Sequence, residues 1–156
     1  MKQIFVGEVY EILPLSNGIV FSYCKEATET EVTVAYKMIS FDNGRITDVA
    51  KNIYLMAKFG HNYKEILKHC DNYITVKSII LQSGKVFLLL ANGTAKLVDT
   101  DSTVTWQGNF NYRNSPASDI VIHKNSIWAT FPECNVLLRY NLTTMREELR
   151  IGGNKS

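Results

Sequence analysis

The densest group of side chains that could do chemistry lies in residues 60–72. This stretch holds His61, Tyr63, His69 and Asp71. Imidazole nitrogens and carboxylate oxygens are ligands that zinc accepts, but a site needs more than two ligands, and the two histidines are eight positions apart. We therefore predict no metal site in this stretch. His61, Tyr63 and Asp71 are instead candidate residues for binding a partner.

A second group of candidates lies nearer the C-terminus. Tyr112 and Arg113 are adjacent, and an aromatic ring beside a guanidinium group is a combination enriched at the energetic centres of protein interfaces. Asp119 opens an apolar run and is the third kind of candidate, a carboxylate at the start of a strand. The candidate binding residues are thus His61, Tyr63, Asp71, Tyr112, Arg113 and Asp119.

No motif of covalent or metal-assisted catalysis is present in the sequence. The chain has no G-x-S-x-G stretch, no glycine-rich phosphate loop, no H-E-x-x-H and no calcium-loop pattern. Cys24, Cys70 and Cys134 are odd in number and lack the close spacing of zinc ligands or of a redox pair. We predict free thiols, no catalytic residue and no cofactor, and the balance of these observations is against an enzyme.

Composition excludes several classes of partner. The 156 residues carry 17 Lys and Arg against 15 Asp and Glu, a net charge of +2, without a basic run that could follow a phosphate backbone. No stretch reaches the roughly 18 consecutive apolar residues of a membrane helix, and Glu8 and Glu11 interrupt the N-terminal apolar segment. We expect a cytoplasmic protein that binds neither nucleic acid nor membrane.

Short apolar runs separated by turn residues fill three stretches, residues 8–59, 73–107 and 116–151. The runs have the length and turn spacing of strands rather than a helical period, and the Asn17-Gly18 pair is a strong hairpin signal. We predict an all-β chain of antiparallel four-stranded meander repeats in one domain, residues 1–156. Residues 52–59 are expected to be a strand, and residues 60–72 an inserted loop with one or two helical turns.

The predicted turns differ in length between the two ends of the strands. Tight turns such as Ser83-Gly84 join first to second and third to fourth strands, whereas the other end carries nearly all the long connections: 25–31, 60–72, 107–115 and 131–135. Long loops on a rigid scaffold are where binding usually occurs. We therefore expect any binding surface on the loop-rich end, and we expect Trp106 and Trp128 to pack between repeats.

The third repeat resembles blades of NHL-type and related six-bladed β-propellers, such as the streptogramin-lyase-like and gluconolactonase-like families. The resemblance covers residues 115–153 best. It is carried by Pro116-x-x-Asp119-Ile120, Ser126-Ile127-Trp128-Ala129-Thr130, Asn135-Val136-Leu137-Leu138-Arg139-Tyr140 and Arg150-Ile151-Gly152-Gly153. It implies about three blades, half of a six-bladed ring, with Asp119 near the central channel. A WD40-like propeller, a β-sandwich and a barrel have similar strand patterns.

Three blades in a row would leave an apolar face open at each end. We expect two copies to associate as a homodimer that completes the ring, unless the chain is half of a longer propeller protein. The predicted function is a non-enzymatic binding module that presents its loop-rich end to an unknown protein or small ligand. The alternative is a propeller enzyme of lactonase or lyase type with a divalent metal in the central channel.

Overall fold

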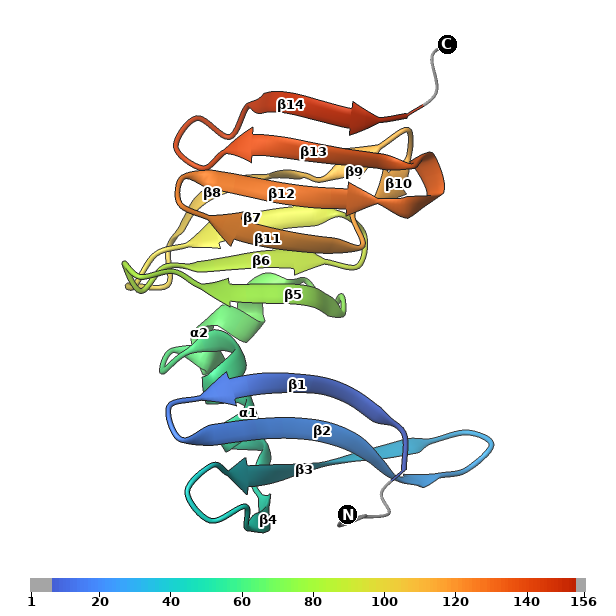
Figure 1. Cartoon of the computed structure of the whole chain (residues 1–156), viewed down its shortest axis with the longest axis vertical. Helices are drawn as coiled ribbons and strands as arrows, with labels where there is room; N and C mark the ends of the chain where they lie inside the picture. Colours follow the sequence, from blue (N-terminus) through green and yellow to red (C-terminus); the bar gives the residue numbers. More distant parts are fainter. Residues whose placement is uncertain (1–6, 154–156) are drawn as a thin grey trace. The chain divides into compact units, whose positions relative to one another are not determined.

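The computed structural model describes residues 7–153 and consists mainly of antiparallel strands (Figure 1). Its strands are β1 (Val9–Leu15), β2 (Gly18–Ala27), β3 (Val32–Ser40), β4 (Ile46–Val49), β5 (Thr75–Ile80), β6 (Val86–Leu90), β7 (Thr94–Val98), β8 (Val104–Asn109), β9 (Asn111–Tyr112), β10 (Ser115–Pro116), β11 (Asp119–His123), β12 (Ser126–Phe131), β13 (Val136–Asn141) and β14 (Glu147–Gly152). The helices are α1 (Lys51–Phe59) and α2 (Tyr63–Leu67), and two 3₁₀ turns span Lys68–Cys70 and Pro132–Cys134. None of the helices in the described range is long and apolar enough to span a bilayer.

The strands form meanders in which each strand pairs with the next. The sheet orders are β1-β2-β3-β4, β5-β6-β7-β8 and β11-β12-β13-β14, and β9 and β10 form a separate short hairpin. All of these pairs are antiparallel. The predicted class, an all-β and propeller-like fold of four-stranded meanders, is confirmed.

The strand registers confirm the predicted tight turns. Leu15 pairs with Gly18, so Ser16 and Asn17 alone make the first turn, and His123 pairs with Ser126 across another two-residue turn. Gly93, between β6 and β7, has a φ of +88°, and a Cβ atom there would lie 2.0 Å from the Asn111 side-chain oxygen. The backbone conformation therefore favours glycine at this position, and a larger residue would also displace the Asn111 side chain.

The strand predicted over residues 52–59 is wrong, because these residues form α1. The segment is rich in Lys, Leu, Met and Ala, which are strong helix formers. In a helix Tyr54 and Lys58 lie on the same side, and both reach the Glu11 carboxylate of β1. Gly60, with a φ of +88°, ends the helix by donating its N–H to the Met56 carbonyl.

The predicted loop insertion at residues 60–72 does contain short helical turns. α2 buries Ile66, and the 3₁₀ turn that follows buries Cys70. Asp71 and Asn72 then adopt left-handed φ values of 53° and 63°, which turn the chain into β5. Small polar residues tolerate this conformation better than most others.

The chain divides into two compact units, Met1–Tyr63 and Lys64–Ser156. The first unit is the sheet β1–β4 with α1 packed on it, and the Tyr54 ring lies 4.8 Å from that of Tyr36. A sheet that carries its own helix is sufficient for a separate small core, and a strand pattern alone does not reveal this boundary.

The second unit is built around one core between two sheets. Side chains of β6 and β7 pack with those of β11, β12 and β13. Phe110 is 2% exposed, and its ring centroid lies 4.7 Å from that of Tyr140, 5.7 Å from Phe87 and 6.1 Å from Trp106. The prediction for Trp106 is thus confirmed, since its ring packs against the core between these two repeats.

Candidate functional site

The outer face of the sheet β11–β14, in the second unit, carries several exposed apolar side chains. Along β12, Ile127, Ala129 and Phe131 are buried in the core, so Trp128 and Thr130 between them point to the opposite side of the sheet. The expectation that Trp128 packs between the repeats is therefore wrong. Its ring lies on the face of the sheet that points away from the core shared with β6 and β7.

The strand register places further apolar residues in line with Trp128. One row across the sheet is Val121, Trp128, Arg139 and Leu149, and the next is Asp119, Thr130, Leu137 and Ile151. We call Val121, Trp128, Leu137, Arg139, Leu149 and Ile151 the outer face. Val121 is 57% exposed, Ile151 51% and Leu149 38%, so this face presents contiguous apolar side chains to solvent.

Two depressions mark the outer face. The larger, of about 520 Å³, lies over Leu137 and Ile151 and continues to Pro132 and Asn135 at the loop-rich end. The smaller, of about 90 Å³, lies between Val121, Trp128 and Leu137. The face is therefore uneven, with shallow pockets that a protruding apolar side chain could fill.

Arg139 supplies the one cation on the outer face. Its guanidinium carbon lies 5.6 Å from the centroid of the Trp128 ring, within range of a cation–π interaction. Its Nε atom is buried and has no hydrogen-bond partner among residues 7–153. A buried donor without an acceptor is unfavourable for folding.

Asp119 lies in the same sheet, beside the first strand of the neighbouring repeat. Its carboxylate is 3.5 Å from the Lys77 ammonium group of β5 and also accepts a hydrogen bond from the Ile120 N–H. Its side chain is 61% exposed. Because both side chains of this pair are partly exposed, the contact is a weak ion pair.

Tyr112 and Arg113 form part of the β9–β10 hairpin at the loop-rich end. Arg113 and Asn114 make its tip, both with positive φ, and the Arg113 guanidinium lies 5.5 Å from the Tyr112 ring. Arg150 lies 5.1 Å from the same ring and donates a hydrogen bond to its hydroxyl. Two guanidinium groups thus lie within cation–π distance of the Tyr112 ring.

Asp71 is close to His69, and both contact Lys96. The Lys96 ammonium group lies 2.6 Å from the Asp71 carboxylate and 2.8 Å from the His69 carbonyl, while the His69 ring donates to the Ser102 carbonyl. The lysine side chain is only 6% exposed. Asp71 therefore neutralises a buried charge in this structure, which gives it a structural role whatever else it binds.

His61 and Tyr63 belong to the end of the first unit. His61 is exposed in the turn after α1, and Tyr63 is half-buried at the start of α2. In the second unit, Asp71 contacts Lys96, Asp119 contacts Lys77, and Arg113 lies against the Tyr112 ring. Whether these residues bind a partner stays a prediction.

Metal-ligating side chains do not gather anywhere within residues 7–153, since no three of His, Cys, Asp and Glu are placed to hold an ion. The three cysteines are unpaired, with Cys70 buried and the other two half-buried. The Cys134 thiol donates to the Tyr112 carbonyl at 3.5 Å. A sulfur engaged in this way is part of the packing of the loop-rich end.

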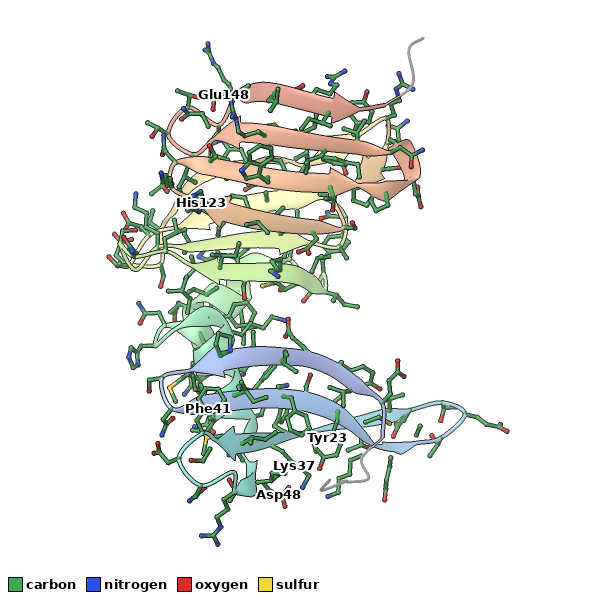
Figure 2. The ribbon with its side chains drawn as sticks, viewed as in Figure 1. Tyr23, Lys37, Phe41, Asp48, His123 and Glu148 are labelled. Atoms are coloured by element: carbon green, nitrogen blue, oxygen red, sulfur yellow. The ribbon has the colours of Figure 1, made fainter. Side chains whose placement is uncertain are left out.

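The first unit contains a separate groove, of about 730 Å³, beside the half of β3 that begins at Val32. Tyr23, Lys37 and Asp48 lie together there, as Figure 2 shows. The Lys37 ammonium group is 2.5 Å from the Asp48 carboxylate, whose pKa it lowers through this hydrogen bond and charge. Lys25 and Lys51 also line the groove, which gives it a net positive charge.

Sequence reasoning overlooked both the outer face and this groove. For the outer face, the alternation of buried and exposed residues along residues 119–151 was a usable signal, because it divides each strand between two faces. For the groove no local signal exists, because its lysines come from β2, β3 and the start of α1. Their proximity depends on the strand pairing and on a helix that the sequence pattern did not predict.

No protein-family model and no curated protein matches the chain. Among solved structures it is similar to apo AztD from Citrobacter koseri (TM-score 0.48, 8% identity, 94% of this chain and 47% of that one). It is also similar to the AfRom2 CNH domain (0.43, 8%, 92% and 50%) and to the extracellular domain of BT4673, from a one-component system of B. thetaiotaomicron (0.41, 12%, 90% and 16%). The chain spans half or less of each structure, and no functional conclusion follows from likenesses at this level.

Proposed function

We propose that this protein is a non-enzymatic interaction module of the β-propeller type that docks a partner protein on the outer face. The single observation that carries the proposal is the contiguous exposure of Val121, Leu149 and Ile151 around Trp128 on one sheet face. Propeller blades bury such faces against a neighbouring sheet. An exposed face of this kind is typical of a docking surface.

The chemistry of the face suits a protein partner. Trp and Arg are the residues most enriched at the energetic centres of interfaces, and here Trp128 and Arg139 lie against each other in the middle of the sheet. The exposed apolar side chains of Val121, Leu149 and Ile151 would be desolvated on binding, which favours association. Completion of a ring by a further sheet, from a second copy or another chain, is one form such docking could take.

Charged substitutions on this face should separate binding from folding. Val121→Lys with Ile151→Lys should change the free energy of unfolding by less than about 0.5 kcal/mol, because both side chains are largely exposed in the isolated chain. Thermal or urea unfolding measures this directly. A loss of several kcal/mol would mean that the face is buried in the protein on its own and would contradict the proposal.

A photo-crosslinking side chain at Val121 tests the docking itself. In the cells from which the protein comes, a benzophenone at this position should give one discrete adduct. Ile151→Lys on the same face should abolish the adduct, whereas Ile80→Lys, an exposed apolar position on β5, should leave it unchanged. An adduct that is insensitive to Ile151→Lys, or the absence of a discrete adduct, would contradict the assignment of this face.

A further inference from the structure

In the first unit, β2 and β3 continue beyond the strands that flank them. They pair from Gly18 opposite Ser40 to Ala27 opposite Val32, whereas β4 reaches only Tyr36 of β3. On the other side, the register of β1 ends at Val9 opposite Tyr23. Residues 25–35 therefore form a two-stranded ribbon, which Figure 1 shows projecting beyond β1 and β4. We call it the hairpin arm.

The hairpin arm has an open strand edge. Among residues 7–153, no strand pairs with Val32–Ala35 on the side away from β2. An unpaired edge offers backbone N–H and C=O groups to another strand. Val32 and Val34 on this strand are 54% and 41% exposed, so the edge also offers apolar side chains, and a two-stranded ribbon by itself is only marginally stable.

The tip of the hairpin arm is ordered by Thr28. Its N–H donates to the Glu31 carbonyl at 2.8 Å, and its hydroxyl oxygen accepts the N–H of Glu31 at 3.0 Å. The connection is thus a closed turn rather than a loose loop. A preorganised extension of this kind loses little conformational freedom when it pairs with another strand.

The charges of the arm and of the groove are complementary. The tip carries Glu26, Glu29 and Glu31, all exposed. The groove lies along the open edge, and Lys25 and Lys51 line it without an ion partner within 4 Å among the described residues. An extended acidic segment with alternating apolar residues would match this groove, and the arm itself is such a segment.

We propose that two copies of this chain pair through the open edges of β3, each placing its acidic tip in the basic groove of the other. Antiparallel pairing about a two-fold axis makes the contact self-complementary. With Val32 of one copy opposite Val34 of the second, Glu31 of one copy lies opposite Ala35 of the other, at the mouth of the groove. The dimer uses a different surface from the outer face and is independent of that proposal.

A charge-swap experiment tests the pairing. The wild-type chain should be a dimer with a dissociation constant in the micromolar range, that is, about 8 kcal/mol of association free energy. A tip variant, Glu29→Lys with Glu31→Lys, and a groove variant, Lys25→Glu with Lys51→Glu, should each weaken self-association at least about tenfold by like-charge contact. All four positions are exposed, so both variants should fold. Sedimentation equilibrium gives the constants.

Mixing the two variants supplies the decisive result. A lysine tip then meets a glutamate groove, and a glutamate tip meets a lysine groove, so a heterodimer should form about as tightly as the wild-type dimer. A wild-type chain that stays monomeric at about 100 μM would overturn the proposal. This holds even if an added acidic peptide binds the groove, because the occupant would then not be a second copy. Variants that dimerise as well as the wild type, or a mixture that does not associate, would also overturn it.

Discussion

Replacing Phe110 with alanine should destabilise the second unit by about 4 kcal/mol, because a buried phenylalanine is lost together with the packing around it. Phe110 is 2% exposed and lies within 4.7 to 6.1 Å, centroid to centroid, of Tyr140, Phe87 and Trp106. It therefore joins the core residues of both sheets. Its removal leaves a cavity that rigid strands on either side cannot fill.

Tryptophan fluorescence during urea unfolding measures this loss. The chain has two tryptophans, Trp106 and Trp128, and both lie in the second unit, so the signal reports that unit. Phe41→Ala is the matched control, since Phe41 is 66% exposed and belongs to the first unit. It should leave the tryptophan transition unchanged. A Phe110→Ala transition within about 1 kcal/mol of the wild type would contradict the shared core.

Asp71→Ala should destabilise the same unit by about 2 kcal/mol, because it leaves the buried Lys96 ammonium group without its anionic partner. The lysine side chain is 6% exposed, and the Asp71 carboxylate lies 2.6 Å from its nitrogen. Among residues 7–153, the His69 carbonyl would remain as the only other acceptor at this atom. Since the Asp71 side chain is 48% exposed, water partly replaces it, which places the loss below that of a fully buried pair.

Replacing Lys96 instead separates the cost of an unpaired buried ammonium group from the stabilisation that the Asp71–Lys96 ion pair contributes. Lys96→Met removes the charge and keeps the apolar stem, so it should be less destabilising than Asp71→Ala. Adding Lys96→Met to Asp71→Ala should recover part of the lost stability. Glu65→Ala, which breaks the exposed pair of Glu65 and Lys68, should change the unfolding free energy by less than about 0.5 kcal/mol. Equal effects of Asp71→Ala and Glu65→Ala would contradict this account.

The strand repeats of the second and third meanders could be predicted from the sequence because their signals are local. Turn residues such as Ser83-Gly84 fix the chain reversals, and short apolar runs fix the strands between them. The helix α1 was not predictable in this way, because Ile53, Tyr54 and Leu55 suit either a strand or a helix over so short a range. Its contact with the Glu11 carboxylate is non-local, and no window along the chain contains both partners.

The candidate surfaces also depend partly on local sequence patterns and partly on residues far apart in the chain. Alternation along β11 to β14 assigns Val121 and Trp128 to one face, but only the presence or absence of a neighbouring sheet decides whether that face is buried. The role of Asp71 also depended on a distant residue, because Lys96 reads as an exposed strand position until the packing of residues 68–71 over it is known. The groove of the first unit requires β2, β3, β4 and the start of α1 to be placed at once.

The central claim, that the outer face binds a partner protein, is tested most directly by quantitative co-purification of the wild-type chain and the Val121→Lys, Ile151→Lys variant at native expression level. Mass spectrometry should show one protein whose recovery falls at least about tenfold with the variant, equivalent to about 1.4 kcal/mol of binding free energy. The variant should unfold at the same temperature as the wild type. Recovery of the same proteins in the same amounts from both chains would contradict the claim.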